Sequence, residues 1–461
     1  MVNVINGQGL AADYADRLDR APRTEEVGVK TAKQNGGAAD RVALLLEHLL
    51  GGPPPLRVRT WDGTQAGPAD GPTLVVRSRR ALRRLLWNPD EIGLARAWVA
   101  GEIDLEGDLE EALGRLETIG RDLAARRHLS PLERAEVLRA AVLLGAVGPA
   151  PKPPPEEIVL SGDKHSRSRD RAAVTHHYDV GNDFYEIVLG PSMTYSCAYW
   201  ARPDDDAYTL DDAQRDKLEL ICRKLGLRTG MRLLDVGCGW GSLVAHAAEH
   251  HGVQAVGITL SQEQAEYARK RIFQAGLSDR VEIRVQDWRD LTDDPFDAVA
   301  SIGMAEHLGA ERWAEYARTL HDLLVPGGRL LNHQIVRRPG PERGGRTFID
   351  AYVFPDGELL PIGNVVSAIE DGDLEVRDVE SLREHYARTL RRWVANLEGQ
   401  WDRAVELAGA GRARVWRLYM TASALSFDAG RIGVAQVLAV RRHGDGASGF
   451  PGTRTSWLGI T

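Results

Sequence analysis

The stretch LLDVGCGWG, residues Leu233 to Gly241, joins an apolar run to a helix-like sequence and decides the fold. Its glycines, at alternate positions, let the backbone turn sharply and approach a ligand without a clash from a Cβ atom. The helix that follows begins with N–H groups that have no intrahelical partner. The Asp-x-Gly-x-Gly-x-Gly spacing differs from the Gly-x-Gly-x-x-Gly fingerprint of dinucleotide-binding proteins. A structural turn also uses such glycines, so the surrounding sequence has to indicate which interpretation holds.

Short apolar runs alternate with helix-like sequence around this loop. They lie at Arg232–Val236, Gln254–Thr259, Val281–Val285, Phe296–Ile302 and Gly328–His333. Strands that alternate with helices form a parallel sheet that is covered on both faces. A later run, Val434–Val440, is expected to add an antiparallel strand. The sequence therefore predicts an α/β fold with a Rossmann-like sheet.

The composition of the chain changes along its length and predicts four segments. Residues 1–40 are polar and rich in Gly and Ala, which is typical of a flexible N-terminal arm. The segment 148–157, GPAPKPPPEE, is expected to be a stiff linker, because proline fixes φ. Residues 158–461 form the main domain, which follows this linker. Residues 41–147 predict a small α/β accessory domain with a strand at Thr73–Ser78 and helices at Pro89–Ala100 and Asp108–Ile119.

The overall composition limits the class of protein. The chain has 461 residues, a net charge of −8 and three cysteines. The negative charge does not favour nucleic-acid binding, and the odd, sparse cysteine count indicates a reducing compartment. The sequence shows no stretch with the length and apolarity of a signal peptide or a membrane span. We therefore expect a cytoplasmic protein, and no metal, because clusters of the types His-x-x-His and Cys-x-x-Cys are lacking.

Polar side chains follow the two apolar runs after the glycine loop. Thr259 ends the first run, where no carboxylate is present, so Thr259 and Gln264 are expected to supply neutral hydrogen bonds to a ligand. Ser261 and Gln264 also have the spacing of a helix capping box. Asp287 and Trp288 follow the next run; a carboxylate accepts from an adenine amino group, and Trp offers a stacking face. Because such sheets bind ligands at the carboxyl ends of their strands, we expect a nucleotide-like ligand here.

Several motifs, taken together, resemble one enzyme family. They are His177–Tyr185 (HYDVGNDFY), Tyr195–Trp200 (YSCAYW), the glycine loop, Thr259–Gln264, Gly303–Gly309 (GMAEHLG), Leu331–Ile335 (LNHQI), Phe348–Gly357 and His385–Leu390 (HYARTL). Their order is similar to that in the cyclopropane-fatty-acyl-phospholipid synthases and the related mycolic-acid cyclopropane synthases, which are class I S-adenosylmethionine-dependent methyltransferases. The resemblance runs from about Arg171 to the C-terminus and continues more weakly through Trp87–Leu109. It departs from the family at Ala305, Asn332 and Gln334 and in the segment Phe354–Leu359.

The resemblance implies a class I methyltransferase sheet of seven strands with a helical insertion over a lipid pocket, and a site for two small molecules. S-adenosylmethionine is then held by Tyr195, Ser196, Gly237, Gly239, Thr259, Leu260, Gln264 and Trp288. To these we add Tyr178, Asp235 and Asp287, from their places beside these motifs. Bicarbonate is the second implied cofactor, held beside the methyl-transfer site by Cys197, Glu306, His333, Ile335 and Tyr386.

The implied reaction transfers a methyl group to the cis double bond of an unsaturated phospholipid acyl chain and leaves a carbocation there. A dry pocket protects this cation from water, and aromatic faces stabilise it. Tyr178, Tyr199 and Tyr386 are candidates for this role. Bicarbonate is a small base that can remove a proton from the new methyl group, which closes a cyclopropane ring. Backbone N–H groups near Cys197 and Ile335 are expected among its donors.

Three other interpretations are open at the level of sequence. They are a methylene- or methyl-branched product from the same cation, methylation of nitrogen or oxygen in a small molecule, and a lipid-binding module without activity. A phospholipid substrate implies peripheral association with the inner face of the cell membrane. The segment Arg77–Trp87, with five arginines and an apolar set, fits a membrane-surface helix and equally a solvated helix over a small core. The sequence is also compatible with a homodimer.

Overall fold

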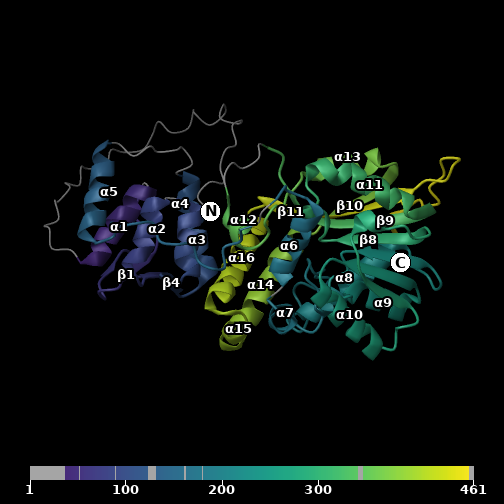
Figure 1. The fold of residues 1–461 in the computed structure, drawn as a ribbon, viewed down its shortest axis with the longest axis horizontal. Coiled ribbons are helices and arrows are strands. Elements are labelled where there is room, and N and C mark those ends of the chain that lie inside the picture. Colours follow the sequence, from purple (N-terminus) through teal and green to yellow (C-terminus); the bar gives the residue numbers. More distant parts are fainter. Residues whose placement is uncertain are drawn as a thin grey trace. The chain divides into compact units, whose positions relative to one another are not determined.

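A computed structural model of the chain describes residues 37–50, 52–88, 90–122, 131–159, 162–178, 180–340 and 346–455. It divides into two compact units, residues 1–154 and 155–461. The division falls inside the segment 148–157, which the sequence predicts to be a linker. Most of the predicted arm, residues 1–36, lies outside the described residues. Figure 1 labels the helices and strands of both units.

The N-terminal unit is built on a four-stranded sheet of order β2-β1-β3-β4. Its strands are β1 (Arg57–Thr60), β2 (Gln65–Ala66), β3 (Thr73–Val76) and β4 (Ile103–Glu106). Its helices are α1 (Ala38–Leu50), α2 (Arg79–Trp87), α3 (Glu91–Val99), α4 (Leu109–Asp122) and α5 (Pro131–Leu143). The predicted strand and helices correspond to β3, α3 and α4. Helix α1 begins inside the predicted arm, where Ala38 and Ala39 donate backbone hydrogen bonds to Asp62 and Thr64.

Helix α2 contains most of the segment that the sequence suggested for a membrane surface. Its Arg84 side chain is buried and donates two hydrogen bonds to Glu102, at 2.8 and 3.1 Å. Arg80 pairs with the same carboxylate at 3.3 Å, and Arg77 pairs with Asp104 at 2.7 Å. Arg84 is therefore a core residue of its unit, whereas the Arg77 and Arg80 side chains are 60% and 61% exposed, and docking of this segment on a membrane stays a prediction.

The C-terminal unit contains the predicted sheet of seven strands, in the order β10-β11-β9-β8-β5-β6-β7. The strands from β9 to β7 in this order are parallel, whereas β11 runs antiparallel to both β9 and β10. The strands are β5 (Arg232–Val236), β6 (Gln254–Thr259), β7 (Val281–Val285), β8 (Phe296–Ile302), β9 (Leu324–Arg337), β10 (Leu374–Ser381) and β11 (Ile432–Arg441). The predicted fold class is therefore confirmed, and β10 is the strand of this sheet that the sequence analysis missed.

Helices cover both faces of this sheet (Figure 1). One face carries α8 (Leu210–Leu225), α9 (Ser242–His251) and α10 (Gln262–Gln274), whose apolar side chains share one buried cluster with the strands. The other face carries α11 (Trp313–Asp322) and α13 (Ile362–Asp371), which contribute to a second buried cluster. Three short 3-10 helices follow strand ends: η1 (Trp288–Asp290), η2 (Ala305–His307) and η3 (Ala310–Arg312).

A helical insertion separates β10 from β11. It consists of α14 (Arg383–Gly399), α15 (Trp401–Ala408) and α16 (Ala410–Asp428). Figure 1 shows these helices beside α6 (Arg167–Tyr178) and α7 (Asn182–Leu189), and α12 (Phe348–Tyr352) follows β9 in the chain. Within the described residues, none of the helices combines the length and apolarity needed to cross a membrane.

Candidate active site

The glycine loop connects β5 to α9 at the carboxyl end of the parallel strands. The backbone N–H groups of Gly237 and Cys238 donate to the carbonyl of Ile258 at 3.0 and 2.9 Å, which holds the loop against β6. Gly237 and Gly239 have φ angles of +83° and +53°, in the left-handed region that favours glycine. A Cβ atom added at Gly239 would meet no heavy atom of the described residues within 4 Å, apart from its chain neighbours. The loop therefore leaves space for a ligand directly against its backbone.

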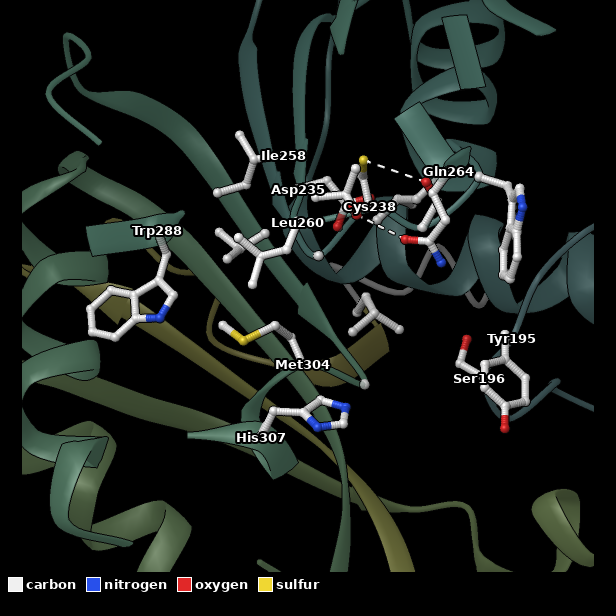
Figure 2. Close-up of a pocket in the computed structure, with 18 of the residues that line it drawn as sticks. Tyr195, Ser196, Asp235, Cys238, Ile258, Leu260, Gln264, Trp288, Met304 and His307 are labelled. Carbon is white, nitrogen blue, oxygen red and sulfur yellow. Dashed lines mark hydrogen bonds between the residues drawn. The ribbon is translucent and has the colours of Figure 1, made fainter. Parts of the chain in front are cut away.

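A pocket in front of this loop brings most of the predicted cofactor residues together (Figure 2). It is lined by Tyr195, Ser196, Asp235, Gly237, Gly239, Thr259, Leu260, Gln264 and Trp288. Figure 2 shows Trp288 on one side of the pocket and Tyr195 with Ser196 on the other, with Met304 and His307 between them. The sequence analysis did not single out Met304, and it treated His307 only as part of a motif. The pocket combines an aromatic wall, an open backbone loop and a few polar side chains, as small-molecule sites commonly do.

Thr259 and Gln264 are joined at the rim of the pocket. The Thr259 hydroxyl donates to Gln264 Oε1 at 2.8 Å. Ser261 caps α10, because its hydroxyl accepts from the Gln264 N–H at 3.2 Å. The Gln264 side chain turns to Thr259 at the pocket and does not complete a capping box. The end of β6 thus presents neutral hydrogen-bonding groups, as expected.

Asp287 is placed differently from the prediction. Its carboxylate accepts from Nε and Nη2 of Arg289, both at 2.8 Å, and it does not line the pocket. Burial alone would raise the pKa of Asp287, but the hydrogen bonds and charge of Arg289 lower it, so the carboxylate is held as an anion by this partner. The Arg289 guanidinium lies 5.6 Å from the centre of the Trp288 ring and lines the pocket. The wall therefore contains Trp288 and Arg289, and the Asp287 carboxylate is engaged by Arg289.

Lys217 is a buried cation at the pocket that the sequence analysis missed. Its Nζ donates to the Ser196 hydroxyl at 2.9 Å. Burial lowers the pKa of Lys217 to about 8 and raises the pKa of Asp235 to about 7, while the attraction between the two charges opposes both shifts. Asp235 Oδ1 is buried and has no partner among the described residues. A signal was present in the sequence, since Gln214, Lys217 and Lys224 recur on the apolar face of α8, where polar side chains are unusual.

Tyr195 belongs to a buried aromatic cluster, which we define as Tyr185, Tyr195, Trp393, Trp416 and Tyr419. The Tyr195 ring lies 5.4 Å from that of Trp393 and 5.6 Å from that of Trp416, measured between centroids. Its hydroxyl donates to that of Tyr419 at 3.4 Å, and burial raises the pKa of Tyr195, so the phenol is neutral. Since Trp393 lies on α14 and Trp416 on α16, the insertion supplies an aromatic wall beside the pocket.

Glu306 lies in η2, directly after β8, and is fixed by one hydrogen bond. Its Oε1 accepts from the backbone N–H of Ile335 at 2.8 Å. The Ile335 N–H, expected among the donors to the anion, donates to Glu306 in this structure. Glu306 Oε2 is buried without a partner among the described residues, and burial raises the pKa of Glu306 to about 7. The carboxyl group is therefore close to half protonated at neutral pH.

His333 on β9 has a defined tautomer. The Lys224 ammonium, which can only donate, donates to Gln436 Oε1 at 2.7 Å and so identifies that atom as the amide oxygen. The Gln436 amide nitrogen then donates to His333 Nδ1, at 3.2 Å. Burial lowers the pKa of His333 to about 3, so the ring is neutral and its proton is on Nε2. This N–H is buried and has no partner among the described residues.

Cys197 and Tyr386 are connected to this region through Leu382. Cys197 Sγ lies 3.7 Å from the Leu382 carbonyl, which also accepts from the Tyr386 N–H at 3.2 Å. The Leu382 N–H donates to Val434, whose strand partner is Ile335. Burial raises the pKa of Cys197, so its thiol is neutral and a nucleophilic role is disfavoured. Contacts through Leu382 and Val434 thus link Cys197 and Tyr386 to Ile335.

The remaining predicted positions are less closely tied to the pocket. Tyr178 ends α6, but its side chain lies outside the described residues. Tyr199 stacks on His385 with 5.0 Å between ring centroids. The Asn332 amide donates to Gln334 Oε1 at 2.7 Å. Because side chains alternate along a strand, this pair lies on the face of β9 opposite to His333.

A sheet of this strand order, with a glycine loop after β5 and a pocket at its carboxyl end, defines a class I S-adenosylmethionine-dependent methyltransferase. The family model for mycolic acid cyclopropane synthetase matches residues 165–437, more than half of the chain, and the chain belongs to this family. A probable fatty acid methyltransferase of Mycobacterium tuberculosis is 42% identical over 412 residues, covering 86% of this chain and 93% of that protein. The cyclopropane-fatty-acyl-phospholipid synthase of Escherichia coli is 36% identical over 277 residues, which is 60% of this chain and 70% of that protein.

A solved structure agrees with this membership. The mycolic acid cyclopropane synthase CmaA1, complexed with SAH and CTAB, is 36% identical to this chain with a TM-score of 0.55. The match covers 58% of this chain and 97% of that one. The open space at Gly239 and the unpartnered Asp235 Oδ1 show that the pocket of this chain fits S-adenosylmethionine.

Proposed function

We propose that the chain transfers the methyl group of S-adenosylmethionine to the cis double bond of an unsaturated phospholipid acyl chain and closes a cyclopropane ring, with bicarbonate as the base. One observation carries this proposal: Glu306 Oε2 and His333 Nε2 are both buried and lack partners among the described residues. Leaving a buried polar group unpaired costs about 1–3 kcal/mol, so such a pair supports a bound polar ligand. The Nε2–H group and a protonated Glu306 are both donors, which suits an anion.

Different residues of the chain hold S-adenosylmethionine and the anion. The glycine loop, Gln264 and Trp288 orient S-adenosylmethionine, whose sulfonium supplies the methyl group. His333 and Glu306 hold the anion, and bound bicarbonate supplies a base for the proton that ring closure releases. Neither role requires a protein nucleophile, in agreement with the neutral thiol of Cys197.

The aromatic cluster fits the cationic stage of this reaction. Methyl transfer leaves a positive charge on the acyl chain, which water would trap. The rings of Trp393 and Trp416 are buried and that of Tyr195 is half-buried, so they exclude water and offer π faces, each worth about 0.5–2 kcal/mol toward a cation. The enzyme has to reach an acyl chain in a bilayer from the membrane surface. The proposed reaction therefore requires that the enzyme docks on the membrane.

One comparison supports an alternative product. The relative with 42% identity is described as a probable fatty acid methyltransferase, a name that does not require a ring. The same cation yields a methylene-branched chain if a hydride shifts before the proton is lost. We favour the ring because Asn332 and Gln334, two of the departures from the family, lie on the face of β9 opposite to His333.

The bicarbonate requirement should depend on pH through Glu306. Burial raises the pKa of this carboxyl to about 7, so it becomes an anion above that pH and then repels another anion. We expect the bicarbonate ion concentration for half-maximal activity to rise as the pH increases through about 7. Glu306→Gln, which stays uncharged, should lose this dependence, whereas Glu311→Gln at an exposed position should keep it.

The measurement is initial rate against bicarbonate at several pH values, in buffers freed of carbon dioxide and then supplemented. Full activity without bicarbonate would contradict the proposed base. Identical pH profiles for the parent chain and Glu306→Gln would contradict the role of Glu306.

A further inference from the structure

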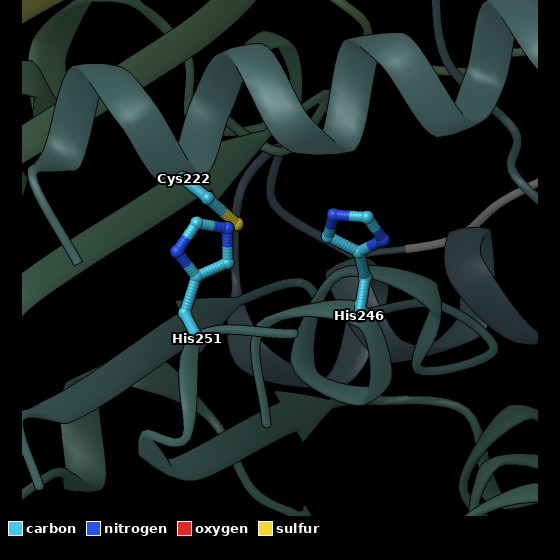
Figure 3. Close-up of side chains that lie close together, drawn as sticks. All are labelled: Cys222, His246 and His251. Atoms are coloured by element: carbon cyan, nitrogen blue, oxygen red, sulfur yellow. The ribbon is translucent and has the colours of Figure 1, made fainter. Parts of the chain in front are cut away.

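A second group of side chains lies between α8 and α9, separate from the residues that line the pocket. Cys222 of α8 and His246 and His251 of α9 each offer one ligand atom, and these atoms lie within 4.8 Å of one another. Figure 3 shows the Cys222 sulfur pointing toward the ring of His251, with the ring of His246 facing the same space. Cys222 is buried, and the side chains of His246 and His251 are only 9% and 18% exposed.

A carboxylate lies beside the two histidines of this group. Glu219 lies one turn before Cys222 on α8, and its Oε2 is 3.0 Å from Nε2 of His251 and 3.3 Å from Nε2 of His246. Its other oxygen, Oε1, accepts from Arg223 Nε at 2.7 Å. Ligating carboxylates in metal sites are commonly held by such an outer partner, which fixes their direction.

The donor types match one kind of metal ion. Zn²⁺ binds thiolate, imidazole and carboxylate in tetrahedral sites, with bonds of about 2.0–2.3 Å. Ligand atoms around such an ion are then roughly 3.3–3.8 Å apart. The two contacts of Glu219 with the histidines are already near this range. The sulfur lies within 4.8 Å of the histidine ligand atoms, so a bound ion has to draw it closer.

The geometry points to a structural zinc site formed by Glu219, Cys222, His246 and His251. The bond to sulfur forms as the thiol proton leaves to solvent, and no redox change is involved. The ion connects α8, which carries Lys217, to α9, which begins at the glycine loop. Its role is therefore to hold two walls of the pocket together, and the partly exposed Glu219 and His251 provide a path of entry. The alternative is a cluster of histidines paired with Glu219 and no metal.

Cobalt substitution decides between these two. The full chain, without a histidine tag and stripped with a chelator, is titrated with Co²⁺ in the absence of oxygen. We expect one Co²⁺ per chain, a near-ultraviolet band from charge transfer between sulfur and cobalt, and the intense visible bands of a four-coordinate ion. Zn²⁺ should displace the Co²⁺, and saturating Zn²⁺ should raise the melting temperature of the stripped protein.

Variants locate the site. Cys222→Ser should abolish the near-ultraviolet band, and His251→Gln should keep the band but weaken Co²⁺ binding at least about tenfold. The matched controls are Cys238→Ser, at another buried cysteine, and His250→Gln, at the exposed neighbouring histidine, and both should bind Co²⁺ with the affinity and the near-ultraviolet band of the parent chain. If Cys222→Ser does not fold, the His251→Gln comparison and the stoichiometry of the parent chain still decide. Absence of saturable binding, or a band that persists in Cys222→Ser, would overturn the proposal.

Discussion

Replacing Gly239 by leucine is expected to lower the affinity for S-adenosylmethionine at least about a hundredfold, or about 2.7 kcal/mol. The loss arises because a side chain at this position grows into open space in front of the loop and not into the protein. That space is where the cofactor has to approach the backbone. Calorimetric titration with S-adenosylmethionine measures the effect directly, and circular dichroism verifies that the variant is folded.

Gly276 offers a matched control for backbone strain. Its φ angle is +68°, close to that of Gly239, and an added Cβ there also meets no heavy atom of the described residues within 4 Å. Gly276 is exposed at the end of α10 and does not line the pocket. Both leucine variants therefore carry a similar strain of about 1–2 kcal/mol, but only the change at Gly239 should weaken binding. Equal affinities of the two variants would show that the cofactor lies elsewhere.

Replacing His333 by alanine is expected to lower kcat by roughly a hundredfold or more while the affinity for S-adenosylmethionine changes little. The reason is that Nε2 is the buried donor assigned to the anion, and the cofactor is held by other residues. Single-turnover methyl transfer to a monounsaturated phospholipid measures the first quantity, and calorimetry measures the second. A large loss of cofactor affinity without a loss of kcat would contradict this division.

Gln436→Met provides a graded version of the same test. Methionine fills a similar volume but cannot donate to His333 Nδ1, so the Nε2–H tautomer is no longer enforced. We expect kcat to fall about tenfold and the bicarbonate requirement to rise. If Gln436 were only a packing residue, the bicarbonate requirement would stay constant while stability fell.

The fold of the C-terminal unit could be predicted largely from local pattern. Strands β5 to β8 and the central part of β9 are short apolar runs, and β11 is apolar from Val434 to Val440 except at Gln436, so their composition indicates burial on both faces. Strand β10 was missed because its sequence, LEVRDVES, is half charged and its buried positions are few. Strands β1 and β4 were missed for a similar reason, since RVRT and IDLE carry charges on their exposed sides.

The site residues that lie in sequence motifs could be predicted, but the contacts that only the tertiary structure creates could not. Nine cofactor positions line one pocket because the loop and strand ends meet at one edge of the sheet. The ion pair of Asp287 with Arg289 and the bond from Ile335 to Glu306 depend on side-chain directions that spacing does not determine. The cluster of Cys222 with His246 and His251 joins two helices; the two histidines are close in sequence, but only the tertiary structure brings Cys222 to them.

The most direct test of the proposed reaction is the proton NMR spectrum of the lipid product. Purified enzyme is incubated with S-adenosylmethionine, bicarbonate and a phospholipid with one cis double bond. Mass alone does not discriminate, because the ring and the exocyclic methylene have the same composition. We predict ring methylene protons at unusually high field together with loss of the alkene signals. Vinylic signals of an exocyclic methylene without upfield ring protons, or an acyl chain that gains no carbon, would contradict the account.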